Sequence, residues 1–438
     1  MKISIIGIGY VGLVQCAVLA EFGMQVTCVD VDKIKIKNLN QGIIPIYEPG
    51  LQDLLHKNAE RIQYTTDIAV TVKDANVVFI AVGTPQSEDG SADISVVLSV
   101  ARDIARNLNH YTVIVNKSTV PVGTGALVEK EIQTILQKGN NNIEFDVVSN
   151  PEFLREGKAV RDCLLPDRVV IGSNSARAKE VLEKVYNVLY INQTPFVFTS
   201  METAELIKYA SNAFLAVKVS FINEIALLAE KVGANTQEVA RGMGMDGRIS
   251  SKFLHCGPGY GGSCFPKDTH ALINIAKECD EELLVINAAI QANKKQISRM
   301  FQRIIACAKE HNYQTISILG LSFKPDTDDV RDAPSLAIIK EIVQAGFNVR
   351  VFCPEGMPET KLYLAEYKDN IVYAVNEYDA VKGSDIVVLM TEWHRFRGLN
   401  LSKMLSLMQS NHFFDLRNVF SKDKEVRGLF QYSGVGGV

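Results

Sequence analysis

One cysteine of this chain stands in a setting suited to chemistry, the segment Gly257-Pro-Gly-Tyr-Gly-Gly-Ser-Cys-Phe-Pro-Lys-Asp268. The glycines before Cys264 remove side-chain bulk and permit positive φ, so that a ligand can approach the backbone and the thiol can stand clear. Lys267 is close enough to favour the thiolate, and Asp268 is placed to orient a water molecule or carry a proton. Most free cysteines are small core residues, but this context predicts that Cys264 is a nucleophile.

A second chemical signature stands at the N-terminus, where Gly7-Ile8-Gly9-Tyr10-Val11-Gly12 follows a predicted strand and opens a predicted helix. Gly7 permits a tight turn, Gly9 lets the backbone approach a pyrophosphate, and Gly12 allows close helix packing. Asp30 follows at the end of the next predicted strand and would accept hydrogen bonds from a ribose diol. Its charge would repel a 2′-phosphate, so the segment predicts an NAD site rather than an NADP site.

Two polar residues lie four apart on a long predicted helix and therefore share one face, Lys208 and Asn212, with Glu205 one turn before them. Such a stripe is either the wet side of the helix or a functional group. A cysteine that attacks an aldehyde generates an oxyanion, and an ammonium and an amide are suitable donors to it. The chemistry therefore favours Lys208 and Asn212 as oxyanion stabilisers.

Polar groups also follow several predicted strands. Glu152 and Glu156 come just after the run FDVVS, and either one is a general base or both are carboxylates favoured by a helix dipole. The hydroxyls of Ser118-Thr119 follow YTVIVNK and are placed to bind phosphate, ribose or a catalytic water. Lys324 and Arg331 lie in the corresponding loop of the last domain, where they either meet phosphates or are solvated.

Composition sets the limits within which these residues act. A chain of 438 residues predicts two or three domains, and its net charge of −4 argues against a nucleic-acid backbone or an anionic membrane as the main partner. The eight cysteines show no C-x-x-C pair and no metal-finger spacing, so we expect reduced thiols, no metal site and a cytoplasmic location. We also see no signal peptide and no uninterrupted apolar stretch of membrane-spanning length.

The elements that must position these groups alternate between strands and helices. Short β-rich runs up to residue 172 predict a mostly parallel, doubly wound sheet, and a segment of about 33 residues from 199 to 231 without Gly or Pro predicts one long helix. Alternation resumes after residue 313, and the C-terminal SGVGGV is expected to be frayed. We predict an α/β protein with two Rossmann-like doubly wound domains joined by a long central helix and a helical middle domain. The expected boundaries are 1–198 for the NAD-binding domain, 199–312 for the central domain and 313–438 for the last domain.

The chain resembles a known family, the nucleotide-sugar 6-dehydrogenases of the UDP-glucose/GDP-mannose dehydrogenase type. The resemblance covers essentially the whole sequence and rests on these motifs in order: GIGYVGL, VDVD, IPIYEPGL, VGTP, STVPVGT, NPEFLREG, ETAELIKYASNAFLA, GYGGSCFPKD and LGLSFKPDTDDVRDAPS. It implies oxidation of C6 of the sugar from alcohol to carboxylate with two NAD⁺ in turn. Cys264 would hold a thiohemiacetal and then a thioester, Lys208 and Asn212 would stabilise oxyanions, and Asp268, Glu152 and Thr119 would organise water or act as base.

The resemblance also implies binding residues. The matching positions for NAD are, with Gly7, Gly9 and Gly12, the residues Val11, Asp30, Lys35, Thr84, Thr119, Glu156, Lys267 and Arg331. The matching positions for the nucleotide sugar are Glu152, Phe153, Leu154, Arg155, Glu156, Lys208, Asn212, Arg248, Phe253, Leu254, His255, Cys256, Gly257, Gly261, Lys324 and Arg417. In the family the arginine matching Arg248 reaches into a neighbouring subunit, which implies a homodimer or a higher homo-oligomer.

The GYGGSCFPKD segment and the surroundings of Arg248 look most like the branch that acts on UDP-glucose, so we expect that substrate and UDP-glucuronate as product. Three alternatives stay open. The same chemistry on GDP-mannose or an N-acetylated UDP-sugar is one, and a two-electron dehydrogenase of the hydroxyacid type is another. The third is a nucleotide-sensing protein that retains only the fold.

Overall fold

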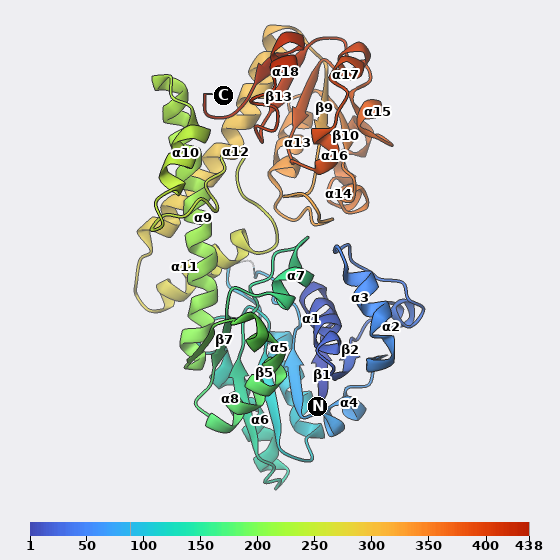
Figure 1. Cartoon of the computed structure of the whole chain (residues 1–438), viewed down its shortest axis with the longest axis vertical. Helices are drawn as coiled ribbons and strands as arrows, with labels where there is room; N and C mark the ends of the chain where they lie inside the picture. The colour runs from blue at the N-terminus through green and yellow to red at the C-terminus, as the bar shows by residue number, and fades with distance from the viewer. Residues whose placement is uncertain (88, 438) are drawn as a thin grey trace. The chain divides into compact units, whose positions relative to one another are not determined.

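The computed structural model describes residues 1–87 and 89–437, and the chain divides into two compact units. The first unit comprises Met1–Ser211 and His270–Asp280, and the second comprises Asn212–Thr269 and Glu281–Val438. Each unit contains one twisted α/β sheet, labelled in Figure 1. The prediction of an α/β protein with two Rossmann-like domains is therefore confirmed.

The sheet of the first unit has the strand order β3-β2-β1-β4-β5-β6-β7-β8. The first six strands in this order, β3-β2-β1-β4-β5-β6, are parallel and follow the order of a dinucleotide-binding domain. Strand β7 pairs with β6 in the antiparallel sense. The strands are β1 (Lys2–Ile6), β2 (Gln25–Val29), β3 (Ile62–Thr65), β4 (Val77–Ile80), β5 (Thr112–Asn116), β6 (Phe145–Ser149), β7 (Val169–Gly172) and β8 (Phe196–Thr199).

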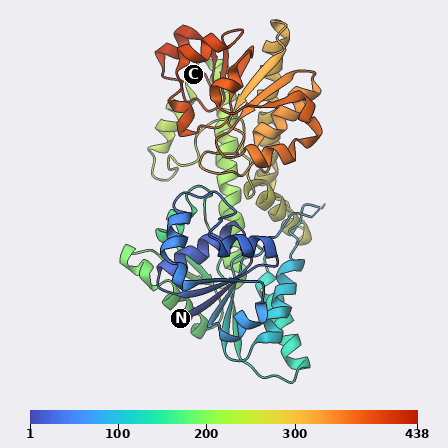
Figure 2. The same ribbon diagram turned by 90° about the vertical axis from the view of Figure 1, so that its right-hand side faces the viewer.

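Helices cover both faces of this sheet, because successive residues of its strands are buried on opposite sides. Val77 and Phe79 of β4 belong to one apolar cluster, and Val78 and Ile80 belong to another. Figure 2 shows the blue strands between blue helices on one side and cyan to teal helices on the other. The helices are α1 (Tyr10–Glu21), α2 (Lys33–Asn40), α3 (Leu51–Lys57), α4 (Ile68–Asp74), α5 (Ser95–Asn107), α6 (Thr124–Lys138), α7 (Ala159–Leu164) and α8 (Ala176–Val185).

The sheet of the second unit is entirely parallel and has the order β11-β10-β9-β12-β13-β14, which repeats the order of the first six strands of the other sheet. Its strands are β9 (Thr315–Leu319), β10 (Asn348–Phe352), β11 (Ile371–Tyr373), β12 (Ile386–Leu389), β13 (His412–Asp415) and β14 (Gln431–Ser433). The helices contained in this unit are α10 (Thr236–Gly244), α12 (Leu284–Glu310), α13 (Pro334–Gln344), α14 (Met357–Tyr363), α15 (Glu377–Val381), α16 (His394–Arg397), α17 (Leu401–Leu407) and α18 (Lys424–Leu429).

Two helices begin in one unit and end in the other. Helix α9 (Met201–Val232) has 32 residues, as the run without Gly or Pro predicted, and α11 (Phe265–Glu278) follows the cysteine segment. Among the described residues, α9 is the helix long and apolar enough to cross a membrane, a test that the core helix of a soluble protein also passes. Its N-terminal part carries Glu205 and Lys208, which are both buried and hydrogen-bonded within the first unit.

The C-terminal tail is ordered where the structure describes it, so the expectation of a frayed end is wrong up to residue 437. Val435 is fully buried, and its backbone N–H donates to the Asn418 side chain at 2.8 Å. The N–H of Gly436 donates to the Glu230 carboxylate at 2.9 Å, and its carbonyl accepts from the N–H of Thr236. Glycine composition suggested flexibility, but these partners hold the segment; Val438 lies outside the described residues.

Candidate functional site

The glycine-rich turn between β1 and α1 has three glycines with different roles. Gly7 adopts φ +94°, and a Cβ on Gly12 would lie 1.9 Å from the carbonyl oxygen of Gly7, so both positions exclude larger residues. A Cβ on Gly9 would meet nothing within 4 Å. The turn is therefore closed by Gly7 and Gly12 and leaves open space at the N-terminus of α1, which is the arrangement a pyrophosphate needs.

Asp30 follows β2 and faces this turn. Its carboxylate accepts from the N–H of Ile8 at 2.9 Å and from the N–H of Asp32 at 3.0 Å, and Lys35 lies 2.9 Å from it. Burial raises the pKa of Asp30, but the hydrogen bonds from Lys35 and from the two backbone groups outweigh burial and lower it overall. A fixed carboxylate at the end of β2 fits a ribose diol, so the residues present fit NAD.

The loops after β4 and β5 bring two more predicted residues together. The hydroxyl of Thr84 donates to the backbone carbonyl of Thr119 at 2.8 Å, and the hydroxyl of Ser118 donates to the carbonyl of Val82 at 2.7 Å. These loops leave the carboxyl ends of neighbouring parallel strands, which is where such sheets bind ligands.

Glu152 and Lys208 form a buried ion pair within the first unit. Nζ of Lys208 lies 2.9 Å from Oε1 of Glu152, and the two side chains are 3% and 7% exposed. Burial opposes ionisation of Glu152, but the ammonium of Lys208 outweighs it and holds the pKa of the carboxyl below its ordinary value. The structure thus joins two predicted catalytic residues that lie far apart in the sequence.

A buried lysine that the sequence analysis gave no role lies in the same region. Lys117 immediately precedes Ser118 after β5, and its Nζ donates to the side chain of Asn150 at 3.0 Å. Burial lowers the pKa of Lys117 to about 8, while Glu152 acts in the opposite direction and Lys208 reinforces the lowering. Its place directly after a strand was the available signal, because the functional groups of such sheets follow strand ends.

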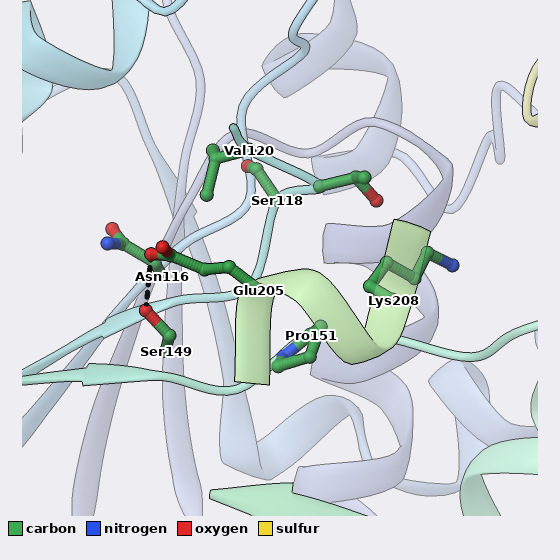
Figure 3. Close-up of a pocket in the computed structure, with 8 residues that line it drawn as sticks. Asn116, Ser118, Val120, Ser149, Pro151, Glu205 and Lys208 are labelled. Atoms are coloured by element: carbon green, nitrogen blue, oxygen red, sulfur yellow. Dashed lines mark hydrogen bonds between the residues drawn. The ribbon is translucent and has the colours of Figure 1, made fainter. Parts of the chain in front are cut away.

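Glu205 has a structural role rather than one in a catalytic stripe. Its carboxylate accepts from the N–H groups of Gly123 and Gly125 at 2.7 and 2.8 Å, at the start of α6, and from the Ser149 hydroxyl at 2.8 Å. Figure 3 shows Glu205 pointing toward Asn116 and Ser149, while Lys208 points away from them. Glu205 therefore anchors α9 to the N-terminus of α6, and Lys208 is the member of this face directed toward Glu152.

Cys264 immediately precedes the first residue of α11, and its carbonyl accepts from the N–H of Asp268 at 2.8 Å. The thiol is partly exposed and lies 3.6 Å from the Ser263 hydroxyl. The N-terminus of a helix stabilises negative charge, which suits a nucleophilic sulfur.

Asp268 lies in the first turn of α11 and is almost completely buried, at 1% exposed. One carboxylate oxygen accepts from Nδ2 of Asn212 at 2.6 Å, and the other lies 2.9 Å from Nζ of Lys267. The second unit thus groups three predicted residues, Asn212, Lys267 and Asp268, at the helix that begins after Cys264.

The glycines before Cys264 allow two loops to pack closely. We expected them to let a ligand approach the backbone, and the structure shows that close packing is the main reason for glycine here. A Cβ on Gly261 would lie 2.1 Å from the carbonyl oxygen of Asp332, and one on Gly262, where φ is +86°, would lie 2.8 Å from the ring of Phe323. The glycine loop is pressed against the loop that follows β9. Absence of side chains lets these two loops pack, and the packing fixes the start of α11.

Cys256, the neighbouring thiol, is a structural residue. It is 2% exposed, accepts from Nδ2 of Asn418 at 3.4 Å, and burial raises its pKa to about 11. Cys16, Cys28 and Cys353 are buried as well. Cys264 is therefore better suited to nucleophilic attack than these four thiols.

The predicted sugar-nucleotide residues of the second unit differ in how far they are available. Arg417 donates to the carbonyls of Met390 and Phe323 at 3.0 Å and pairs with Glu392, so its guanidinium already joins loops. His255 contacts the Arg417 carbonyl at 2.9 Å. These two residues support the loop framework.

Further predicted positions are spread over the loops of both units. Leu254 is buried, Phe253 adopts φ +64° and packs near Phe265, and Gly257 donates its N–H to Asn223 at 2.9 Å. In the second unit Lys324 lies over the Phe323 ring, and Arg331 pairs with Asp329. In the first unit Arg155 pairs with Asp162, and Phe153 packs under Arg168.

Three models of the UDP-glucose/GDP-mannose dehydrogenase family match in order: the NAD binding domain at residues 1–190, the central domain at 202–295 and the UDP binding domain at 317–422. The chain belongs to the UDP-glucose/GDP-mannose dehydrogenase family.

Full-length relatives agree with this family. The chain is 48% identical to a UDP-glucose 6-dehydrogenase of Rhizobium meliloti, over 100% of this chain and 99% of the relative. It is 44% identical to a UDP-glucose 6-dehydrogenase of Bacillus subtilis, over 99% of this chain and 93% of the relative. A solved UDP-glucose dehydrogenase of Pyrobaculum islandicum is 33% identical, covers 100% of this chain and 98% of its own, and has a TM-score of 0.90.

The matched family models indicate which ligand each of the two α/β domains binds. The glycine turn and Asp30 lie in the NAD binding domain, so NAD is the cofactor. Lys324 and Arg331 lie in the UDP binding domain. The matches to this family and to full-length relatives show that the protein is an oxidoreductase that binds a nucleotide sugar. The cysteine segment lies in the central domain.

Proposed function

We propose that this protein oxidises UDP-glucose to UDP-glucuronate with NAD⁺ and that Cys264 is its nucleophile. The names of the full-length relatives support the substrate. The observation that carries the mechanism is the partly exposed Cys264 at the N-terminus of α11, one turn before the buried Asp268–Asn212 pair. In total, one UDP-glucose, two NAD⁺ and one water give UDP-glucuronate, two NADH and three protons.

The first oxidation needs a group that takes the proton of the C6 hydroxyl. NAD⁺, when bound, supplies the electron-pair acceptor for both oxidations. Glu152 is held ionised by Lys208, so it can accept a proton directly or through a water oriented with Thr119. Lys208 compensates the negative charge that develops on the sugar oxygen.

The second oxidation needs a covalent step, because a bare aldehyde has no good hydride to give. The sulfur of Cys264 forms a bond to C6 as the carbonyl π bond breaks, and the oxygen becomes an oxyanion that Lys208 and Asn212 stabilise. Oxidation of this thiohemiacetal gives a thioester. Water adds to its carbonyl, Asp268 takes the proton, and cleavage of the carbon–sulfur bond returns Cys264 to its starting state.

Counting NADH tests this proposal. With limiting UDP-glucose, the enzyme is expected to produce two NADH per sugar, and Cys264→Ser to slow formation of the acid at least about 10³-fold. Cys279→Ser is the matched control, since that thiol is exposed and has no assigned role. One NADH with free aldehyde, or full activity of Cys264→Ser, would contradict the mechanism. Turnover of GDP-mannose with UDP-glucose untouched would contradict the substrate.

We also propose a homodimer formed through α9, in which Arg248 completes the partner's active site. Phe214, Phe221 and Leu228 recur every seven residues on α9 and are 63%, 42% and 58% exposed, which supports a covered apolar face. The side chain of Arg248 is 90% exposed beside Asp246 and is free to reach outward. Sedimentation of Phe214→Glu against wild type tests this; an unchanged mass would contradict the α9 interface.

Two further assignments belong to this proposal. A cytoplasmic location is supported by the eight free cysteines, one of which the chemistry needs in reduced form.

Functional boundaries near residues 198 and 312 are supported by the gaps between the three matched family domains. Limited proteolysis that cut first inside 1–198 or 313–438 would contradict these boundaries.

A further inference from the structure

A cluster of potential metal ligands lies in the second unit, apart from every residue assigned to the reaction. It consists of Cys307 near the end of α12, His311 directly after that helix, and His412 at the start of β13. One ligand atom from each residue lies within 4.8 Å of the others. The expectation of no metal site rested on cysteine spacing, which takes no account of histidines supplied by a distant strand.

The three residues have the chemistry of a transition-metal site. Thiolate and imidazole together select Zn²⁺ and related borderline metals over Mg²⁺ or Ca²⁺, which prefer oxygen. In a tetrahedral zinc site, bond lengths of about 2.0 to 2.3 Å place ligand atoms roughly 3.3 to 3.7 Å apart. The present separations of up to 4.8 Å exceed that range, so metal binding would draw the three side chains closer together.

The surroundings of the imidazoles resemble the outer contacts of metal ligands. Nδ1 of His311 lies 3.0 Å from the backbone carbonyl oxygen of Cys307, and Nδ1 of His412 lies 3.1 Å from the hydroxyl of Tyr313. Ligating histidines commonly bond through one ring nitrogen while the other is held by such a partner. The Gln431 side chain also bonds to the His412 ring, and a metal would replace that contact or use the amide oxygen.

Charge and access favour a dication. Glu310 directly precedes His311 in the chain, so its carboxylate and the thiolate that Cys307 would present to a metal together supply two negative charges. His412 is 6% exposed, Cys307 is partly exposed and His311 is exposed, which gives the cluster a buried floor and an open side. Three protein ligands with an open side leave the fourth position to water.

We propose that Cys307, His311 and His412 bind one Zn²⁺ ion, which links the C-terminal end of α12 to the start of β13. The ion would tie the longest helix contained in the second unit to its sheet. Its role is structural, because none of the three ligands belongs to the nucleotide or cysteine sites. Binding then stabilises the folded second unit by mass action and leaves the chemistry unchanged.

The test uses the full-length protein, stripped with a chelator under reducing conditions and titrated with Zn²⁺ against a chromophoric chelator. We expect one tight site per chain, weakened at least about 100-fold in Cys307→Ser and in His311→Ala. His311 is exposed, so its loss is not expected to unfold the chain. Matched controls are Cys279→Ser and His394→Ala, which remove an exposed thiol and an exposed imidazole elsewhere.

Co²⁺ provides a second readout that does not depend on activity. The wild-type protein is expected to show a thiolate-to-cobalt charge-transfer band that Cys307→Ser lacks and Cys264→Ser retains. Absence of stoichiometric Zn²⁺ binding would overturn the proposal. Equal binding by wild type and His311→Ala, or binding lost in Cys264→Ser but kept in Cys307→Ser, would overturn it as well.

Discussion

Lys208 and Glu152 form a nearly dry ion pair: Nζ and Oε1 are 2.9 Å apart, and neither side chain is more than 7% exposed. The carboxylate also accepts from the N–H of Leu154 at 2.5 Å. A pair this deeply buried is held by its mutual contacts, because each charge alone would be strongly disfavoured. The same pair therefore governs both the stability of the first unit and the ionisation of its candidate base.

Removal of one partner is expected to be costly. Glu152→Gln leaves the Lys208 ammonium buried without its carboxylate, so the free energy of unfolding should fall by about 3 to 5 kcal/mol. Turnover should fall by about 10² to 10⁴ if Glu152 is the base. Urea unfolding and NADH formation measure the two effects. Asp103→Asn is the control, since the exposed Arg106–Asp103 pair should contribute no more than about 0.5 kcal/mol.

A double substitution distinguishes pairing from packing. In the double variant with Glu152→Gln and Lys208→Met, the second substitution removes the charge that the first leaves unpaired. Lys208→Met should therefore lower the free energy of unfolding by less in the Glu152→Gln background than in the wild-type protein. Additive costs would show that the two side chains contribute independently and would contradict the coupled pair.

Lys117 predicts a pH dependence of stability. Its pKa in the folded protein is about 8, below its ordinary value of 10.5, because the ammonium is buried. The folded protein binds this proton less tightly than the unfolded chain does, so the free energy of unfolding rises with pH. The contribution of Lys117 to that free energy is fully present above pH 10.5 and is lost as the pH falls through about 8. The wild-type protein should thus gain about 2 kcal/mol between pH 8 and 9.5 from this group.

Lys117→Met isolates that contribution. Urea unfolding of the variant should lack the increment between pH 8 and 9.5, while Lys130→Met, at an exposed position of α6, should keep it. Subtracting the pH profile of Lys117→Met from that of Lys130→Met cancels the contributions of all other titrating groups to the free energy of unfolding. Parallel profiles for Lys117→Met and wild type would show that the amine does not titrate in this range.

The sequence was most informative where a feature is local. The runs that form β4 and β12 are recognisable as strands because every residue in them is apolar. Strand β3, IQYT, and the three-residue β11 are not recognisable in this way, since they are short, partly polar and lie at sheet edges. Their pairing is fixed by neighbouring strands, which local patterns do not describe.

The site shows the same division. Cys264 and Asp30 stand out by their fixed distances from glycines, which are local relationships. The pairing of Lys208 with Glu152 joins residues 56 positions apart, and the hydrogen bond from Asn212 to Asp268 also spans 56. Burial is the main cause of the lowered pKa of Lys117. Such properties arise only when the chain has folded, so residue type and spacing could not supply them.

Two glycines of the nucleotide turn should separate stability from cofactor binding. Gly12→Ala places a methyl group against the Gly7 carbonyl, so the free energy of unfolding should fall by at least ~2 kcal/mol. Gly9 has φ −79° and open space around it, so Gly9→Ala should change stability by less than about 1 kcal/mol. The added methyl should instead raise the KM for NAD⁺ about tenfold or more. An unchanged KM would argue that the pyrophosphate does not approach Gly9.

Arg248 allows a test of whether subunits share an active site. Its side chain is 90% exposed and its partner Asp246 is two residues away, so Arg248→Ala should change stability by no more than about 0.5 kcal/mol. Loss of activity in this variant alone would not show on which subunit the residue acts. Mixing it with Cys264→Ser does, because a mixed dimer contains one site in which both residues are intact.

Random exchange of two inactive variants should therefore restore about a quarter of wild-type activity, since half of the dimers are mixed and each has one complete site. The matched control mixes Cys264→Ser with Asp268→Asn, which lie on the same unit of one chain, so every site keeps one defect. Recovery in the first mixture and none in the second is the expected result. If subunit exchange is verified by mass and the first mixture stays inactive, Arg248 acts within its own chain, and the shared site is wrong.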